Sequence, residues 1–147
     1  MIKTILIDDE PLARSVVREY LQSHAEIEIV QECSDGFEGV KAIAQHKPDL
    51  IFLDIQMPKI NGFEMLELLD QPPAVIFTTA FDEFAMKAFE THAIDYLLKP
   101  FSKDRFDKAV QKWFQQRQSP KTDTAIIQEA IRQPEERNRI VVKEGGN

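Results

Sequence analysis

The sequence lacks a second cysteine and a long hydrophobic run. Cys33 is the one cysteine among 147 residues, so no disulfide can form within the chain. It lies near the end of an apolar run, and we interpret it as a small packing residue and not as a reactive thiol. No apolar run approaches the roughly 20 residues of a membrane span, and no signal segment begins the chain. We therefore expect a cytoplasmic protein that does not bind a membrane.

An excess of basic residues is also missing. The chain has 18 Lys and Arg against 25 Asp and Glu, which gives a net charge of −7. Binding to nucleic acid needs clustered Lys and Arg against phosphates, so the general field of this chain disfavours it. A hydrophobic fraction of 43% is enough to build the core of one ordinary domain.

Short apolar runs alternate with stretches of helical period up to about residue 117. Runs of this kind, bounded by polar residues, are typical of buried parallel strands. They cover residues 5–7, 27–33, 50–53, 74–77 and 94–98. The (βα)5 order predicts an α/β fold, a parallel five-stranded sheet with helices on both faces, because crossovers between parallel strands are right-handed.

Two of the expected helices have a clear pattern. The first begins at Pro11, a residue tolerated in the first turn. Its predicted apolar stripe consists of Leu12, Ala13, Val16, Val17, Tyr20 and Leu21. Asp35 and Glu38 have the spacing of a capping box that opens a second helix. The side chains expected to point inward from it are Phe37, Val40, Ile43 and Ala44.

Polar side chains follow the predicted strands at the point where each strand ends. Asp8 and Asp9 follow the first run, Asp54 the third, Thr79 the fourth and Lys99 the fifth. Because the carboxyl ends of parallel strands meet at one edge of an open sheet, we expect these groups to lie close together. Repulsion among three carboxylates favours a bound cation, and Mg²⁺ prefers such hard oxygen ligands.

This set of groups is suited to phosphoryl transfer. With a metal neutralising the charge, one carboxylate could attack phosphorus and form an acyl phosphate. Lys99 would pair with one phosphate oxygen, and the Thr79 hydroxyl would donate a hydrogen bond to another. Each of these residue types is also common in ordinary loops and strands. The prediction therefore depends on their joint occurrence at four strand ends.

The motifs at these positions resemble the receiver domain of bacterial two-component response regulators. They occur in the family's order and are Ile7-Asp8-Asp9-Glu10, Leu53-Asp54-Ile55-Gln56-Met57-Pro58, Asn61-Gly62, Thr79-Ala80 and Leu98-Lys99-Pro100-Phe101. The resemblance implies a flavodoxin-like (βα)5 fold with strand order 2-1-3-4-5. It also implies a phosphorylated signalling module that is not an enzyme with turnover on a substrate.

The resemblance implies a role for each acidic residue. Asp54 would accept a phosphoryl group from a sensor histidine kinase. Asp8 and Asp9, together with Asp54 and the backbone carbonyl of Gln56, would bind Mg²⁺.

The remaining roles follow from the same resemblance. Lys99 would pair with the phosphoryl group, and its bond to Pro100 matches the family's cis peptide. Thr79 would be the switch hydroxyl and Tyr96 the switch aromatic residue. Thr78 points to the opposite face of an alternating strand and is interpreted as a packing residue.

We expect the phosphorylation signal to leave through another face. If Thr79 moves toward the phosphoryl group, Tyr96 can turn inward and reshape the face built by the fourth helix, the fifth strand and the fifth helix. We expect this face to mediate homodimerisation, with Phe84 and Phe89 as candidate contacts.

A subgroup is also indicated. The stretches 81–90 and 93–101 are similar to LytTR-type (LytR/AlgR) regulators. Residues 1–118 are predicted to form the receiver domain and 119–138 a linker with a possible short helix. Residues 139–147 resemble the first strand of a LytTR-type DNA-binding domain, so DNA would be bound only through the missing remainder.

Three alternatives remain open from the sequence. A hydrolase or phosphotransferase with an Asp nucleophile would need a cap or substrate loops, and the connections here are short. A flavin-binding domain would need a hydroxyl- and glycine-rich loop after the first strand, where Asp8 and Asp9 stand instead. A stand-alone receiver would act by protein contact alone, and sequence beyond residue 147 would distinguish it.

Overall fold

One parallel sheet organises the fold. In this computed structural model, which describes residues 1–118, the strands are β1 (Ile2–Ile7), β2 (Ile27–Cys33), β3 (Leu50–Leu53), β4 (Ala74–Thr79) and β5 (Asp95–Leu98). They are arranged in the order β2-β1-β3-β4-β5, and all neighbouring pairs are parallel. The predicted (βα)5 receiver fold with this strand order is confirmed.

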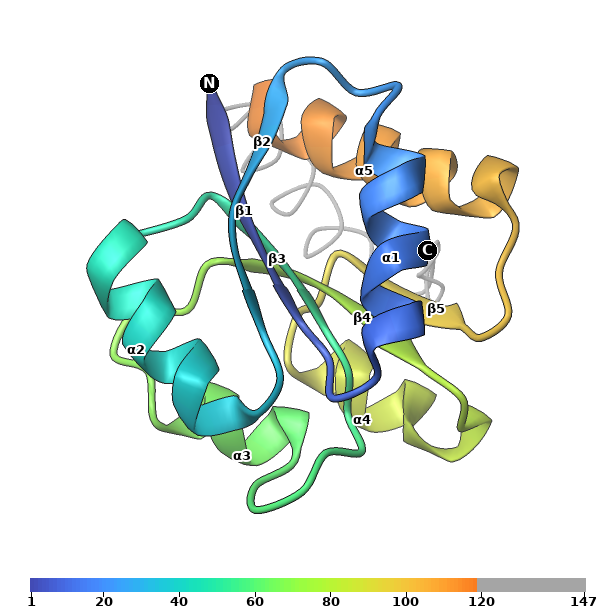
Figure 1. The fold of residues 1–147 in the computed structure, drawn as a ribbon. Helices are drawn as coiled ribbons and strands as arrows, with labels where there is room; N and C mark the ends of the chain where they lie inside the picture. The colour runs from blue at the N-terminus through green and yellow to red at the C-terminus, as the bar shows by residue number, and fades with distance from the viewer. Residues whose placement is uncertain (119–147) are drawn as a thin grey trace, which may run out of the picture. The chain divides into compact units, whose positions relative to one another are not determined.

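Helices connect the strands and cover both faces of the sheet (Figure 1). They are α1 (Pro11–Leu21), α2 (Gly36–His46), α3 (Gly62–Glu67), the 3-10 turn η1 (Asp82–Phe84), α4 (Ala85–Glu90) and α5 (Lys103–Gln118). Figure 1 shows α1 and the start of α5 on one face and α2, α3 and α4 on the other. The first compact unit of the chain ends at Val110, within α5.

The three central strands are buried and carry the site at their carboxyl ends. In β3 all four side chains are buried, as expected for a strand covered on both faces. Cys33, at the end of β2, is 1% exposed, and burial raises the pKa of its thiol to about 12. This agrees with a packing role. Within residues 1–118, no helix is long and apolar enough to cross a membrane.

Helix α2 packs on the sheet through small residues and through only part of the side chains predicted from its pattern. The inward positions of Ile43, which is buried, and Val40, which is partly buried against the core, are confirmed. Phe37 and Ala44 were expected to point inward, but both are exposed. Gly36, Gly39 and Ala42 are buried instead. A Cβ atom at Gly39 would lie 2.9 Å from Ile7 Cδ1, so the glycine lets the helix approach the sheet closely.

Helix α1 buries a narrower stripe than its sequence predicts. Val17 and Leu21 are buried, whereas Leu12 is 81% exposed and Val16 is 37% exposed. Together with Phe101, the exposed pair borders a hollow of about 300 Å³ beside Lys99. The stripe therefore divides into a core row and a surface row.

The boundary predicted at residue 118 and the interpretations of 119–138 and 139–147 concern residues at or outside the end of the described part of the chain. They stay predictions.

Candidate metal and phosphoacceptor site

Three carboxylates meet at the carboxyl edge of the sheet. Asp8 and Asp54 are buried and Asp9 is half-buried, and each offers an oxygen within 4.8 Å of the others. The sequence-based prediction that these residues come together is confirmed. Buried carboxylates this close repel one another, so the donor set fits a hard divalent cation such as Mg²⁺.

Asp54 directly follows β3 and is held in place by the end of β1 and the start of α3. Its amide donates a hydrogen bond to the Ile7 carbonyl at 2.9 Å. A Cβ atom at Gly62 would lie 2.6 Å from the Asp54 carbonyl oxygen, so a larger residue would push against the site. Burial raises the pKa of Asp54 to about 7, the Asp8 carboxylate adds to this rise, and Lys99 opposes it.

Lys99 is the cation of this cluster. Its Nζ donates a hydrogen bond to Asp8 Oδ2 at 2.8 Å and lies 3.7 Å from Asp54 Oδ2 and 3.4 Å from Glu10 Oε1. Burial acts to lower the pKa of Lys99, but the hydrogen bond to Asp8 and the neighbouring charges outweigh it and raise the pKa. Lys99 therefore stays charged beside the carboxylates.

The residues expected to sense the site lie on β4 and β5. Thr79 is fully buried, and its Oγ1 accepts a hydrogen bond of 3.3 Å from the Phe81 amide. The Tyr96 hydroxyl donates to the Phe81 carbonyl. Thr78 is buried, in agreement with a packing role, and the Lys99–Pro100 peptide is cis as expected.

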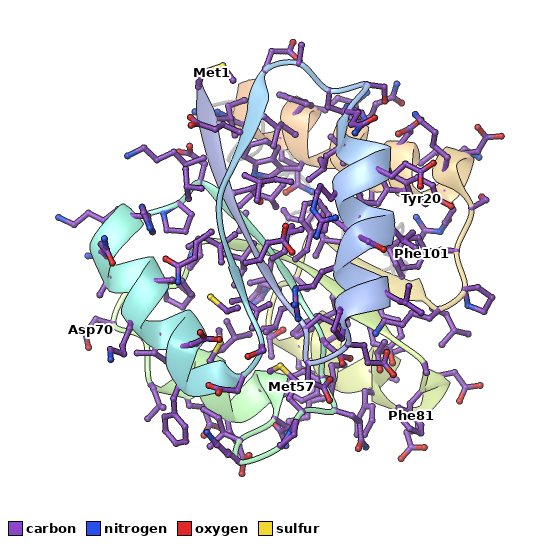
Figure 2. The ribbon with its side chains drawn as sticks, in the orientation of Figure 1. Met1, Tyr20, Met57, Asp70, Phe81 and Phe101 are labelled. Atoms are coloured by element: carbon purple, nitrogen blue, oxygen red, sulfur yellow. The ribbon has the colours of Figure 1, made fainter. Side chains whose placement is uncertain are left out.

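The loops after β3 and β4 lie at the same end of the molecule as the site. Figure 2 labels Met57 and Phe81 in these loops, far from Met1 at the amino end of β1. Gln56 lies in the first of these loops with its side chain exposed. A role for its backbone carbonyl in metal binding stays a prediction.

Sequence reasoning missed several residues that shape this edge. The Glu10 amide donates to Asp8 Oδ1 at 2.9 Å, and Arg14 Nη1 donates to the Asp8 carbonyl at 2.6 Å. Asn61 and Glu64 form a reciprocal capping box that starts α3 behind Asp54. The Asn-x-x-Glu spacing carried that signal, whereas a charged residue on a helix, such as Arg14, usually indicates a solvated surface.

The class of this protein is defined by its fold and its site together. The fold is a parallel sheet of order 2-1-3-4-5, and the site at its carboxyl edge is an acidic cluster that suits a metal and includes a paired lysine. Residues 4–111 match the model of the response regulator receiver domain. The chain belongs to this family. Receiver domains bind Mg²⁺ at an acidic cluster, and the group of Asp8, Asp9 and Asp54 stands in that position here.

Relatives and solved structures agree with this family. The chain is 50% identical over 131 residues to the transcriptional regulatory protein BtsR of Escherichia coli (strain K12), covering 88% of this chain and 54% of that protein. It thus spans about half the length of the curated relatives it matches. The receiver domain of mrkE from Klebsiella pneumoniae is 35% identical with a TM-score of 0.70, covering 76% of this chain and 93% of that one. The receiver domain of AraT from Geobacillus stearothermophilus is 28% identical with a TM-score of 0.71, covering 81% and 98%.

Proposed function

We propose that Asp54 accepts a phosphoryl group from a sensor histidine kinase and that the chain acts as a switch without turnover on a substrate. The observation that carries this proposal is the environment of Asp54. It is a buried carboxylate that lies with Asp8 and Asp9 in one acidic cluster and 3.7 Å from the Lys99 ammonium. Such a group is costly to keep charged unless positive charge approaches it, and a bound Mg²⁺ together with Lys99 would supply that charge.

The transfer exchanges one bond to phosphorus for another. An Asp54 carboxylate oxygen forms the new bond, and the bond from phosphorus to the donor nitrogen breaks, so that the imidazole leaves with the electron pair. Asp8, Asp9, Asp54 and the Gln56 carbonyl are the groups that would hold Mg²⁺. When bound, the metal supplies charge neutralisation for the carboxylates and the phosphoryl oxygens.

Two side chains of this chain would recognise the product. Lys99, already charged and adjacent to Asp54, would pair with a phosphoryl oxygen as a compact point charge. Thr79 would turn its hydroxyl from the Phe81 amide to another phosphoryl oxygen. These movements need no new residue at the site.

Phosphorylation can be tested directly by the mass of the intact protein. Incubation with acetyl phosphate and Mg²⁺ is expected to add one phosphoryl group, and the Asp54→Asn variant is expected to add none. Omitting Mg²⁺ should suppress the reaction in the wild type. An Asp54→Asn protein that gains the same mass would contradict the proposal.

The output face is proposed to be formed by α4, β5 and α5. Phe89, Met86 and Leu98 lie on it with exposures of 79%, 72% and 45%. Phe84, the other candidate from the sequence, is instead partly buried against Phe63. Release of the Tyr96 hydroxyl from Phe81 would let the ring turn inward and change this face.

Homodimerisation through that face can be measured by sedimentation velocity. Beryllofluoride with Mg²⁺, which mimics the phosphoryl group, is expected to shift the protein toward a dimer. Phe89→Arg should prevent the shift, because it places a charge on the apolar face. Leu68→Arg, at a residue of 55% exposure just after α3, is the matched control and should dimerise as the wild type does. A Phe89→Arg protein that still dimerises would exclude this face.

The whole protein is proposed to be a cytoplasmic transcription regulator of the LytTR type. The support is the similarity to BtsR, whose name states transcriptional regulation, and the sequence pattern of 139–147. DNA would then be bound by a domain that follows this chain.

A further inference from the structure

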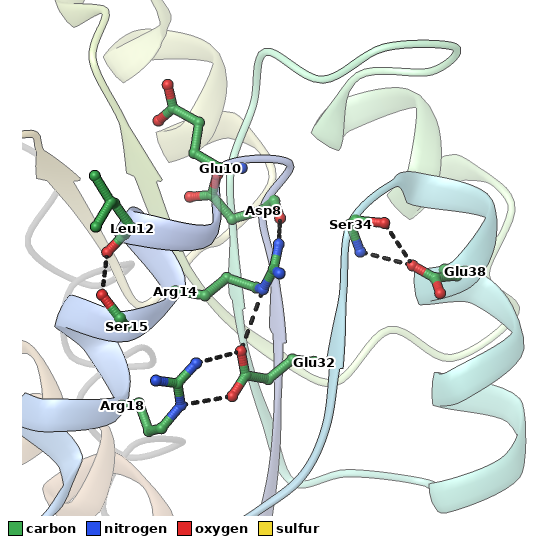
Figure 3. Close-up of polar contacts among 9 residues, drawn as sticks. All are labelled: Asp8, Glu10, Leu12, Arg14, Ser15, Arg18, Glu32, Ser34 and Glu38. Atoms are coloured by element: carbon green, nitrogen blue, oxygen red, sulfur yellow. Dashed lines mark hydrogen bonds and ion pairs between the residues drawn. The ribbon is translucent and has the colours of Figure 1, made fainter.

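Arg14 links the backbone of Asp8, at the end of β1, to the neighbouring strand β2. Its Nη1 donates to the Asp8 backbone carbonyl at 2.6 Å, and its Nε donates to Glu32 Oε1 at 3.2 Å (Figure 3). The Arg14 side chain is 18% exposed. One guanidinium therefore spans from the first acidic residue of the site to a carboxylate on β2.

Glu32 is itself fixed on the far side of Arg14. Arg18, one turn further along α1, donates to both Glu32 oxygens, from Nε at 2.8 Å and from Nη2 at 2.9 Å. The hydrogen bond from Arg18 is the main reason that the pKa of Glu32 lies below its ordinary value. A planar fork of this kind holds a carboxylate in one orientation. Glu32 is thus a stable anchor for Arg14.

The contacts of Asp8 fall into two groups. Lys99 and the Glu10 amide contact its two carboxylate oxygens, which are the atoms that a metal would use. The other two contacts use only the backbone of Asp8: its carbonyl accepts from Arg14, and its amide donates to the Cys33 carbonyl at 3.0 Å. Metal binding can rearrange the first group, whereas the second group can persist in both states.

We propose that Arg14 is a positioning residue for the metal site: by holding the Asp8 carbonyl against Glu32, it orients the Asp8–Asp9 peptide for octahedral Mg²⁺. This inference rests on the proposed Mg²⁺ site. Groups that orient metal ligands commonly change metal affinity by roughly 10- to 100-fold when they are removed.

A through-space effect of the Arg14 charge has the opposite sign. A cation beside the acidic cluster repels Mg²⁺, so removal of the charge alone would strengthen binding. Removal of the orienting contact would weaken it. The direction of change in an uncharged variant therefore distinguishes the two effects.

Titration calorimetry of the full chain with Mg²⁺ and, separately, with Ca²⁺ tests the proposal. Arg14→Met is expected to bind Mg²⁺ about tenfold more weakly. The loss for Ca²⁺ should be below about threefold, because Ca²⁺ accepts irregular geometry and Mg²⁺ does not. Arg14→Lys keeps the charge but cannot bridge both partners, and it should also lose Mg²⁺ affinity.

Two further variants complete the test. Glu32→Gln weakens the anchor without touching Asp8 and should reduce Mg²⁺ affinity by roughly threefold but Ca²⁺ affinity by less, because the lost negative charge alone would weaken the binding of both ions equally; the proposal thus stays testable if Arg14→Met does not fold. Lys103→Met, which removes one positive charge at an ion pair with Asp107, away from Arg14 and Glu32, is the control and should stay within about twofold of the wild type. Unchanged or tighter Mg²⁺ binding by Arg14→Met and Glu32→Gln, or an equal loss for both ions, would overturn the proposal. If the wild type binds no Mg²⁺, the metal site itself is refuted, and with it this role.

Discussion

The β1 side and the β4 side of the acidic site differ in how firmly hydrogen bonds hold their side chains. On the β1 side, Asp8 is contacted at its amide, its carbonyl and both carboxylate oxygens. On the β4 side, the Thr79 carbonyl accepts a hydrogen bond of 2.7 Å from the Lys99 amide, but the Thr79 side chain is held only by a long hydrogen bond of 3.3 Å from the Phe81 amide to its Oγ1, among the contacts described. The comparison indicates a division of labour in which the β1 side binds and the β4 side responds.

The largest expected effect separates the two sides by metal affinity. Asp8→Asn should weaken Mg²⁺ binding on the order of 100-fold, because it removes a charged ligand. Thr79→Val should leave Mg²⁺ affinity within about twofold, since the hydroxyl has no proposed contact with the metal. Isothermal titration calorimetry measures both. Similar losses in the two variants would end the distinction between a binding and a responding side.

The buried charge on the binding side should make the metal-free protein less stable as the pH rises. The pKa of Asp54 is raised from 3.8 to about 7, so the folded state holds a proton that the unfolded chain has lost. The stability contributed by this proton therefore falls between about pH 4 and pH 7 and is absent above that range.

Asp54→Asn removes the free-energy cost of burying a charged carboxylate in the folded protein. It should raise the free energy of unfolding by about 2 kcal/mol at pH 8 and by less at pH 5. Urea denaturation at the two pH values in the presence of a chelator gives the comparison. A variant that is less stable than the wild type at pH 8 would show that the buried charge of Asp54 does not destabilise the folded protein.

On the responding side, Phe81 is expected to set how long the phosphoryl group survives. Its side chain, 42% exposed and two residues after Thr79, can hinder the approach of water to the acyl phosphate. Phe81→Glu should speed loss of phosphate about fivefold, equivalent to about 1 kcal/mol in the barrier. Phe81→Leu keeps an apolar side chain and should stay close to the wild type. The time course of intact mass after removal of acetyl phosphate measures the rates, and equal rates in all three proteins would rule out this shielding.

The smallest expected effect lies away from both sides and checks that stability can change without changing the site. Lys47 ends α2 with a φ of 49°, a left-handed conformation that favours glycine. Lys47→Gly should raise the free energy of unfolding by about 0.5–1 kcal/mol. Lys41→Gly, in the exposed interior of the same helix, should lower it by about 1 kcal/mol. Thermal unfolding compares them, and the same sign for both variants would refute this explanation of Lys47.

The site residues were predictable because they stand at the ends of apolar runs. Asp8, Asp54 and Lys99 needed only the rule that parallel strands end at one edge, whereas the choice of Thr79 over Thr78 also needed the alternation of side chains in a strand and the resemblance to receiver domains. The order of the strands came from the resemblance to receiver domains, since the alternation of strands and helices allows several orders.

The burial of α2 and the role of Arg14 depend on tertiary packing, which the periodic spacing of apolar residues in the sequence does not show. Phe37 has the spacing of a core residue but is exposed, because the buried face of α2 is the one that carries its glycines: Gly39 packs closely on Ile7 of β1, and Gly36 packs on Ile60. Arg14 looks like a surface residue, and its role depends on the carbonyl of Asp8 and on Glu32, which is 18 positions away.

The most direct test of the central claim is to locate the phosphoryl group after reaction with acetyl phosphate and Mg²⁺. Borohydride reduces an aspartyl phosphate to homoserine, which tandem mass spectrometry can assign to one position. The account predicts homoserine in place of Asp54 and unmodified Asp8 and Asp9. Reduction at Asp8 or Asp9, or at no residue, would contradict it.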